Sequence, residues 1–461
     1  MTNKLQADYL VIGGGAMGMA FADVIMTETE STVIMVDRYH QPGGHWNVAY
    51  PYVRLHQPSA FYGVNSKKLG TDSIDAGGWN KGLYELATNS EVCAYFDQVM
   101  QQQFLPTGRM QYFPMSEYQG DNKFRSLMSG EEFEVVAKKL VDATFMNVTV
   151  PSMVKPAYSV AEGVECVPPN SLPRVSGDYS HYVIIGAGKT GMDACLFLLK
   201  NGVNPDVISW IMPRDSWLLD RANIQPAGLF ADSLVQGFAR QMAAIAASES
   251  VDDLFEKVHA CGQLLRFDET VTPTMYRCAT VTKAELEQLR RIKNVIRLGH
   301  VQSINTDAIV FDKGEVKTSD ATLFVDCTAD GLERRAAEPV FASNKITLQS
   351  VRTCQQVFSA AYIGHIEATY DNEDKKNEMS VPVPHPDSHI DFLRTTLANS
   401  LNAAQWSQDQ DLQVWLKNAR LDGFSQADSD DSEMDPKVME ELILTTMAGI
   451  TKLQKLLAEV E

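Results

Sequence analysis

The chain has 461 residues, of which 44% are hydrophobic and 21% are charged. This balance is typical of a globular enzyme and excludes a fibrous or wholly disordered chain, and the length suits two or three domains. The formal net charge of −19 disfavours nucleic acid and anionic membrane surfaces as partners, because like charges repel each other.

No apolar run is long enough to span a bilayer, and the polar stretch 1–8 lacks the basic and apolar regions of a signal peptide. We therefore expect a cytoplasmic protein without a membrane or nucleic-acid partner. A homodimer is an open alternative to a monomer.

Seven cysteines occur, and no two of them are spaced as C-x-x-C or C-x-x-x-x-C. The sequence therefore lacks the closely spaced cysteine pairs that bind a structural zinc ion, and it lacks the closely spaced thiols of a flavin-linked redox disulfide. We expect buried free thiols. His385 and His389 stand four residues apart, but Pro386 interrupts the spacing and no third ligand is identifiable, so no metal site is expected.

The first predicted unit is a strand, a tight turn and a helix. Residues 9–12 form an apolar run, residues 13–18 read GGGAMG, and residues 19–26 carry apolar side chains at helical spacing. A second short strand is predicted over residues 32–36, directly before Asp37. This order predicts a βαβ unit.

The glycines of this turn suit a dinucleotide. Gly13 permits the tight turn, Gly15 lets the backbone approach a pyrophosphate, and Gly18 lets the helix pack closely on the strand. The N-terminus of the helix then faces the phosphates. Asp37 follows Gly18 by 19 residues (37 minus 18), where a carboxylate accepts hydrogen bonds from a ribose. The residues expected to bind this dinucleotide are Gly13, Gly15, Met17, Gly18, Asp37 and Arg38.

The same order returns later in the chain. Residues 182–185 form an apolar strand, and residues 186–191 read GAGKTG. A helix is predicted over residues 192–199 and a further strand over residues 207–212. The sequence therefore contains a second βαβ unit.

The second unit ends its last strand with a basic residue. Arg214 can accommodate a 2′-phosphate, which favours NADPH over NADH, although pairing with the adjacent Asp215 is the alternative role for this arginine. A P-loop is excluded, because that motif needs a glycine five residues before Gly188 and the chain has Val183. The residues expected to bind the second dinucleotide are Gly186, Gly188, Lys189, Thr190, Gly191 and Arg214.

Other elements are predicted between and after the two units. A helix is expected near residues 92–102, and a strand-rich part over residues 133–150. Residues 229–264 have Ala, Met and Leu at helical spacings, which predicts a continuous helical insertion or lid.

The C-terminal half begins with short strands. Residues 295–298, 308–311 and 321–325 are apolar and separated by polar turns, which predicts a meander that ends the second domain. Residues 426–435 are acidic and are expected to be a solvated loop, with a partner-binding segment as the alternative. Residues 436–461 are predicted to form an amphipathic helix.

The sequence also resembles a known group of proteins. Residues 43–46 read GGHW, which is similar to the G-G-T-W of class B flavin monooxygenases, and residues 50–59 read YPYVRLHQPS, which is similar to their Y-P-x-x-R-x-D-x-x-S. Residues 141–145 and 326–331 resemble the two crossovers between their dinucleotide-binding domains. The group includes Baeyer–Villiger and N-hydroxylating enzymes, and its members are two-dinucleotide-binding-domain flavoproteins.

This resemblance implies FAD at the first unit and NADPH at the second. It implies an α/β fold with two Rossmann-like domains, in which residues 1–175 and 326–461 form a discontinuous FAD domain with a C-terminal helical region. Residues 176–325 would form the NADPH domain, with residues 229–264 as its helical insertion.

The resemblance also implies a set of residues around the flavin. It places Gly44, Trp46, Arg54 and His56 at FAD, with Trp46 and His56 against the isoalloxazine. A histidine there can hold or pass a proton, whereas the alternative is an interior histidine satisfied by one hydrogen bond. Trp46 has the alternative role of an ordinary core aromatic residue. Arg221 is expected near the nicotinamide, so that His56 and Arg221 are the candidate catalytic residues.

Three positions depart from the pattern of the group. The F-x-G-x-x-x-H fingerprint is missing, since residues 168–173 read PPNSLP. Phe145 replaces a glycine of the first crossover, and His56 replaces the acid of the flavin-side motif. These departures indicate a divergent branch.

The activity implied by the resemblance is that of a monooxygenase. NADPH would reduce FAD, reduced flavin and O₂ would form a peroxyflavin, and one oxygen atom would reach a small organic substrate. A second hypothesis is an NADPH-dependent flavin reductase or a flavin oxidase without oxygen transfer. A third is a flavoprotein that binds its cofactor only for folding or partner recognition.

Overall fold

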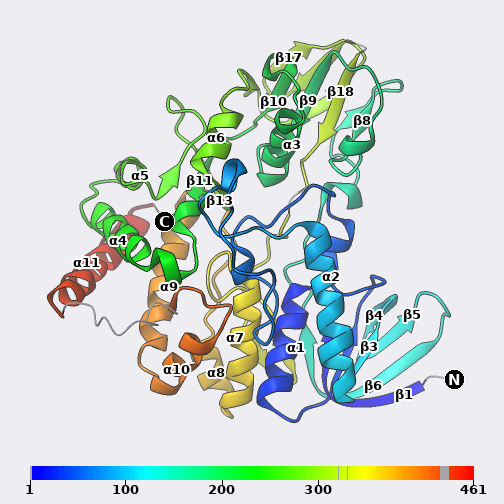
Figure 1. The fold of residues 1–461 in the computed structure, drawn as a ribbon, viewed down its shortest axis with the longest axis vertical. Coiled ribbons are helices and arrows are strands. Elements are labelled where there is room, and N and C mark those ends of the chain that lie inside the picture. Colours follow the sequence, from blue (N-terminus) through cyan, green and yellow to red (C-terminus); the bar gives the residue numbers. More distant parts are fainter. Residues whose placement is uncertain (1–2, 320, 330, 426–435, 461) are drawn as a thin grey trace.

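The fold is built around two mainly parallel sheets, one below the other in Figure 1. A computed structural model of the chain describes residues 3–319, 321–329, 331–425 and 436–460. The first sheet has the order β19-β20-β6-β1-β2-β3, formed by Phe341–Ala342, Lys345–Thr347, Glu132–Asp142, Asn3–Ile12, Val33–Val36 and Met110–Phe113.

Apolar residues alternate along the first sheet and fill a core on each face. Val11 packs with helices α1 (Ala16–Glu28) and α7 (Gln356–Thr369) on one face, and Leu10 packs with Phe124 on the other. Phe124 belongs to a hairpin that continues the sheet from β6, formed by β4 (Ser116–Gly120) and β5 (Lys123–Ser126). Burial on both faces is typical of parallel strands.

The first domain is discontinuous, as expected. β20 is parallel to β6, with Thr347 paired with Asp142, although the whole second unit lies between them in sequence. Helix α7 lies beside α1, and Gly364 of α7 faces Phe21 and Val24 of α1.

The second sheet has the order β14-β10-β9-β18-β8, and all of its strands are parallel. Its strands are Asn294–Ile296, Ile208–Ile211, His181–Ile185, Thr322–Asp326 and Cys166–Val167. Helices α3 (Lys189–Lys200) and α6 (Lys283–Leu289) pack on one face. A small sheet of β15 (Val301–Ile304), β16 (Ala308–Phe311), β17 (Gly314–Lys317) and β7 (Ser159–Val160) packs on the other.

The predicted meander is therefore only partly correct. Of the three apolar runs, 308–311 lies in the meander as β16, whereas 295–298 and 321–325 contribute β14 and β18 to the parallel sheet. β18 is buried along its whole length, as a central strand must be. The domain limits at 175 and 325 stay a prediction, and β7 and β8, which precede residue 176, pair with strands of the second unit.

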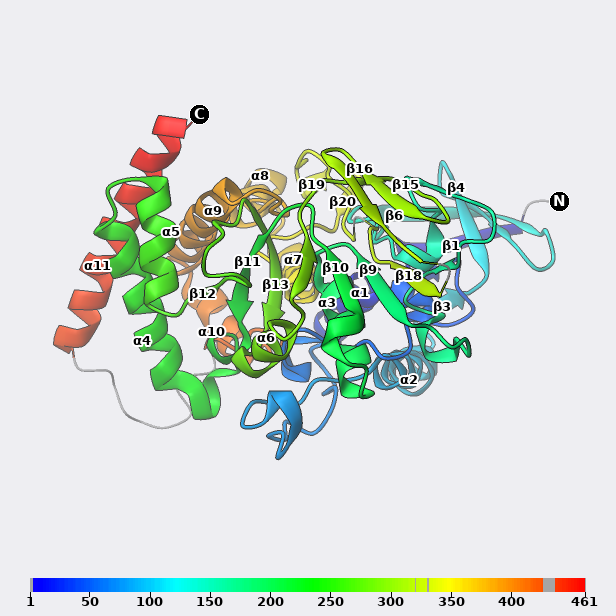
Figure 2. The ribbon, with the colours of Figure 1, turned by 90° about the horizontal axis from the view of Figure 1, so that it is seen from above.

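A helical lobe lies at one end of the molecule in Figure 2. Helices α4 (Ala227–Ala246), α5 (Val251–Ala260), α9 (Ile390–Trp406) and α11 (Pro436–Val460) surround one core beside a sheet of β11 (Ser216–Asp220), β12 (Leu264–Leu265) and β13 (Met275–Val281). α11 lies along α4, with Gly449 against Met242. The amphipathic terminal helix is thus confirmed, and residues 426–435 lie outside the described part of the chain.

Two predicted elements end earlier than expected. The continuous helix over 229–264 is wrong, because α4 ends at Ala246 and the Ser250 side chain accepts a hydrogen bond from the Asp253 amide to begin α5. The strand-rich part over 133–150 ends as β6 at Asp142. The helix near 92–102 is confirmed as α2 (Asn89–Val99), which a π-helical turn continues to Phe104.

The expectation of free thiols is wrong for two cysteines. Cys278 of β13 and Cys354, before α7, form a disulfide across 76 residues of sequence. Spacing could not show this pair, because only the fold brings β13 against the loop before α7. The remaining thiols are free, at Cys93, Cys166, Cys195, Cys261 and Cys327.

Two short helices, α8 (Glu373–Met379) and α10 (Gln410–Asn418), complete the first domain beside α7. Within the described ranges, no helix combines the length and the apolar character needed to cross a membrane. The same residues contain no group of three or more His, Cys, Asp or Glu side chains placed to hold a metal ion.

Candidate functional site

The first glycine turn places the N-terminus of α1 at the carboxyl edge of the first sheet. Gly15 is the N-cap, and no side chain caps the helix. A Cβ atom on Gly18 would lie 2.0 Å from the carbonyl oxygen of Gly13, so the close helix packing requires glycine at position 18. No side chain therefore accepts hydrogen bonds from the first amide N–H groups of α1, and these groups can bind an anion instead.

Asp37 lies at the end of β2 beside this turn. It is 4% exposed, and it accepts hydrogen bonds from the amides of Gly14, at 2.6 Å, and Tyr39, at 2.8 Å. Burial raises the pKa of Asp37 to about 6, against the opposing effect of these hydrogen bonds. Each carboxylate oxygen retains a lone pair that a ribose hydroxyl can use.

The neighbouring predicted residues face different surroundings. Arg38 is mostly exposed, and its guanidinium lies 3.7 Å from Glu117. The Met17 side chain is buried in the core under α1, so only its backbone can face a ligand at the turn.

The segment 43–46 packs directly on the first glycine turn. The amide of Gly43 donates to the carbonyl of Gly14 at 2.9 Å, and a Cβ atom on Gly44 would lie 2.9 Å from Cα of Gly15. Trp46 is buried, and its indole N–H donates to the Tyr62 hydroxyl at 2.6 Å. Two glycine backbones therefore meet where the resemblance places the flavin nucleotide.

The residues that follow Trp46 contact helix α3, which begins at the second glycine turn. The Tyr50 hydroxyl donates to Asp193 of α3 at 2.7 Å, and the Tyr52 ring stacks on Phe197 of α3 with centroids 4.3 Å apart. Asp193 also forms an ion pair with Lys189, in which both side chains are nearly buried. Segment 43–58 thus contacts the first predicted dinucleotide turn and the helix that follows the second one.

The structure brings the two candidate catalytic residues together. The Arg221 Nε donates to the carbonyl oxygen of His56 at 2.7 Å, and its other nitrogens donate to Asn80 at 3.0 Å and to Glu285 at 2.9 Å. Arg221 is 1% exposed, so its guanidinium is directed at protein groups. It therefore holds the flavin-side segment against β13 and α6.

The electrostatic surroundings of His56 favour its neutral form. Burial, followed by the charges of Lys189 and Arg221, lowers the pKa of His56 well below its ordinary value. Burial also lowers the pKa of His45, beside Trp46, to about 4. A neutral imidazole donates one hydrogen bond and accepts one, but it carries no stored proton near pH 7.

The second glycine turn is more open than the first. Gly188 is the N-cap of α3, no side chain caps the helix, and no atom lies within 4 Å of the position that a Cβ on Gly188 would take. A Cβ on Gly191 would instead lie 2.0 Å from the carbonyl of Gly186. Thr190 lies in the first turn of α3. The chain thus leaves space at the helix N-terminus where a pyrophosphate binds.

Arg214 is not paired with the neighbouring acid. Asp215 is held by Arg297, with Nε at 2.8 Å and Nη2 at 3.0 Å. The Arg214 side chain is 40% exposed, and its Nη2 lies 3.8 Å from Asp387. Arg54 is also exposed, and its backbone bridges to Thr88. The alternative role of Arg214, pairing with Asp215, is therefore not observed.

Comparison with known proteins identifies relatives in mycobacteria. The chain is 54% identical over 417 residues to the uncharacterized proteins Mb2023 of Mycobacterium bovis and Rv2000 of Mycobacterium tuberculosis, and the match covers 90% of this chain and 78% of each relative. The chain belongs to their family. No protein-family profile matches it.

The fold of this family is also found among solved structures. Cyclohexanone monooxygenase with bound ε-caprolactone superposes with a TM-score of 0.50 over 92% of this chain and 96% of that chain, at 13% sequence identity. The resemblance to class B monooxygenases is thus confirmed for the fold, with the low identity of a divergent branch.

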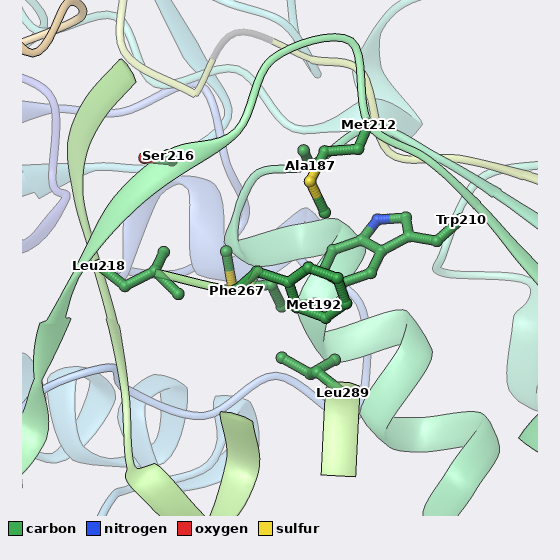
Figure 3. Close-up of a pocket in the computed structure, with 8 residues that line it drawn as sticks. All are labelled: Ala187, Met192, Trp210, Met212, Ser216, Leu218, Phe267 and Leu289. Carbon is green, nitrogen blue, oxygen red and sulfur yellow. The ribbon is translucent and has the colours of Figure 1, made fainter. Parts of the chain in front are cut away.

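A small cavity in this family member lies behind the second glycine turn (Figure 3). Its volume is about 10 Å³, enough for one water molecule and too small for a cofactor ring. The Trp210 indole N–H beside it donates to the carbonyl of Gly186 at 2.9 Å. The side chains around it are Ala187, Met192, Trp210, Met212, Ser216, Leu218, Phe267 and Leu289.

Some residues of the site could not be selected from the sequence. Asp193 follows Lys189 by four residues, a helical spacing that predicts an ion pair, but its contact with Tyr50 is long-range. Asn80 and Glu285, which bind Arg221, carried no signal, because they come from separate loops and helices.

Proposed function

We propose that the chain is an FAD-dependent oxidoreductase that consumes NADPH and transfers one oxygen atom from O₂ to a small organic substrate. The observation that supports this most is the segment 43–58, which contacts the first glycine turn and helix α3, the helix that begins at the second glycine turn. The fold shared with cyclohexanone monooxygenase agrees with this assignment.

The first glycine turn fits FAD. The uncapped N-terminus of α1 offers amide groups to a pyrophosphate, and Asp37 offers acceptor oxygens to the adenosine ribose. The flavin end would extend along segment 43–58, past Trp46 toward His56. When bound, FAD supplies the chemistry that accepts a hydride and reacts with O₂.

The second glycine turn fits NADPH. The space at Gly188 admits a pyrophosphate, and the exposed Arg214 offers a guanidinium to the 2′-phosphate. Lys189, the first residue of α3, pairs with Asp193 and would offer a second cationic group to the phosphates.

The residues between the two sites have positioning roles. Arg221 fixes the backbone at His56, and Tyr50 fixes the same segment to α3. The neutral His56 would hydrogen-bond to the cofactor or the substrate without adding a charge to a site that must exclude water. Near-neutral proton storage, the role first expected of His56, requires a higher pKa than its surroundings give it.

A reductase or oxidase without oxygen transfer is the second candidate function. It is favoured by the departures from the class B pattern, since Phe145 replaces a crossover glycine and residues 168–173 lack the F-x-G-x-x-x-H fingerprint.

The test is a reduction under anaerobic conditions, followed by oxygenation. The purified protein should be yellow, and NADPH should bleach it faster than NADH does. Heavy-isotope O₂ is then added with amines, thioethers and ketones, and products are analysed by mass spectrometry. Heavy oxygen in an organic product supports the monooxygenase. If the flavin bleaches but hydrogen peroxide is the only oxygen product under every condition, the result supports the reductase or oxidase. If NADPH does not bleach the flavin, both functions are refuted.

A further inference from the structure

The Cys278–Cys354 disulfide lies at the carboxyl edge of the first sheet. Thr347 at the end of β20 pairs with Asp142, which also pairs with Ile12 at the end of β1. The loop that carries Cys354 therefore leaves the sheet at the edge where the first glycine turn leaves it. Ligands of such sheets bind outside the carboxyl ends of the strands.

Helix α7, which follows Cys354, confirms this placement. His365 of α7 hydrogen-bonds to Glu28 at the end of α1, at 2.7 Å, and Gly364 faces Phe21 and Val24. The two helices therefore run in the same direction. The first turn of α7 lies beside the N-terminus of α1, where the glycine turn is (Figure 1).

The other half of the disulfide is connected to the candidate catalytic residues. The Thr280 hydroxyl donates to the carbonyl of Cys278 at 3.0 Å, and the carbonyl of Thr280 accepts from Arg221 at 3.5 Å. Arg221 in turn binds the backbone of His56 at 2.7 Å. A continuous series of contacts thus leads from His56 to the disulfide.

Both cysteines have an unusual backbone conformation. Cys278 has a φ of +55° and Cys354 a φ of +59°, values that residues other than glycine rarely adopt. Cys278 lies within β13, where the register of this strand with β11 shifts between the pairs Trp217–Tyr276 and Leu219–Thr280. Backbone conformations of this kind gather at functional sites.

We infer that Cys278 and Cys354 form a redox-active disulfide, which accepts two electrons from NADPH at the proposed cofactor site. The S–S bond breaks, NADPH gives up a hydride and solvent supplies a proton, so that each sulfur ends as a thiol and NADP⁺ is released. The balance is NADPH + H⁺ + Cys–S–S–Cys → NADP⁺ + 2 Cys–SH. This inference rests on the proposed function, because that function supplies NADPH and the route for the hydride.

The test is an anaerobic NADPH titration of the FAD-loaded protein with two readouts. Flavin bleaching is followed first, and each sample is then denatured and alkylated with iodoacetamide for mass spectrometry. Five cysteines should be alkylated before the titration and all seven after it. Full reduction should consume a second equivalent of NADPH beyond the one that bleaches the flavin, and the new labels should map to Cys278 and Cys354.

Variants distinguish this pair from other thiols. The double variant Cys278→Ser/Cys354→Ser should consume one equivalent only, whereas Cys261→Ser, at the end of α5, should still consume two. A wild-type protein whose flavin bleaches completely, but whose Cys278 and Cys354 stay unlabelled after a second equivalent of NADPH, would overturn the inference, define a structural cross-link and leave the proposed function intact. No bleaching by NADPH would refute the proposed function and this inference together.

Discussion

A methyl group at Gly188 gives the sharpest test of the second dinucleotide site. Gly188 has a φ of −75° and a ψ of 179°, which any L residue can adopt, and the position of its Cβ is free of atoms within 4 Å. Replacing glycine by alanine at a compatible position stabilises a protein by about 0.4–1 kcal/mol, and the loss of a favourable N-cap costs a similar amount. The free energy of unfolding of Gly188→Ala should therefore stay within about 1 kcal/mol of the wild-type value.

The affinity for NADPH should change much more. The methyl group would occupy the space through which a pyrophosphate reaches the amides at the start of α3. Losing one hydrogen bond to a charged group costs about 1.5–3 kcal/mol, which weakens binding by about 10- to 100-fold. Isothermal titration calorimetry gives the Kd, and urea unfolding followed by circular dichroism gives the stability.

The matched control is Gly191→Ala, three residues along the same turn. Its new Cβ would meet the carbonyl of Gly186 at 2.0 Å, so the helix must move and the free energy of unfolding should fall by about 1–3 kcal/mol or more. A Gly188→Ala protein of normal stability and unchanged NADPH affinity would refute the assignment of this turn to the pyrophosphate.

Three further predictions follow from single contacts. FAD binding to the apoprotein should weaken by up to about tenfold per pH unit below the pKa of Asp37, because a protonated carboxyl cannot accept hydrogen bonds from both ribose hydroxyls. The Asp37→Asn variant should bind FAD weakly at every pH. A flavin fluorescence titration measures both affinities. Since burial raises that pKa from 3.8 to about 6, the folded apoprotein holds the proton more tightly than the unfolded chain, and the Asp37 contribution to stability should be lost as the pH rises from 4 to 6 in urea unfolding. Arg214→Ala should reduce the preference for NADPH over NADH by about 10- to 100-fold in bleaching rates at low cofactor concentration, and an unchanged preference would contradict its 2′-phosphate role. Tyr50→Phe removes the hydroxyl that donates to Asp193 at 2.7 Å, so the free energy of unfolding should fall by about 1–3 kcal/mol, and an unaltered urea midpoint would show that this contact does not stabilise the domain interface.

The parts of the fold that local patterns determine could be predicted from the sequence. Both glycine turns lie between a strand and a helix, because the residues that make a βαβ unit are contiguous in sequence. The sequence cannot place β18 in its sheet, since a short apolar run has the same pattern in a meander and in a parallel sheet. The break at Ser250 was missed because the apolar spacing continues across it, while one capping hydrogen bond ends the regular helix.

The site was predictable only as far as its motifs extend. Gly188 and Arg214 could be assigned because their roles depend on position within one turn. The Tyr50–Asp193 hydrogen bond and the Cys278–Cys354 disulfide join segments from different domains, and a single sequence carries no signal for such pairs. The lowered pKa of His56 also depends on tertiary structure, because burial lowers it most and the charges of Lys189 and Arg221, from distant parts of the sequence, lower it further.

The discontinuous first domain has a consequence for the order in which the chain acquires structure. Tyr9 of β1 contacts Glu367 of α7 across 358 residues, so closing this contact in an unfolded chain carries a large entropic cost. The second sheet is made mostly from residues 166–326, all of them between these two partners, and its folding shortens the loop that must close. During synthesis the second sheet can therefore fold before the first domain is complete, because the first glycine turn leaves the ribosome early but α7, which packs on α1, is made much later.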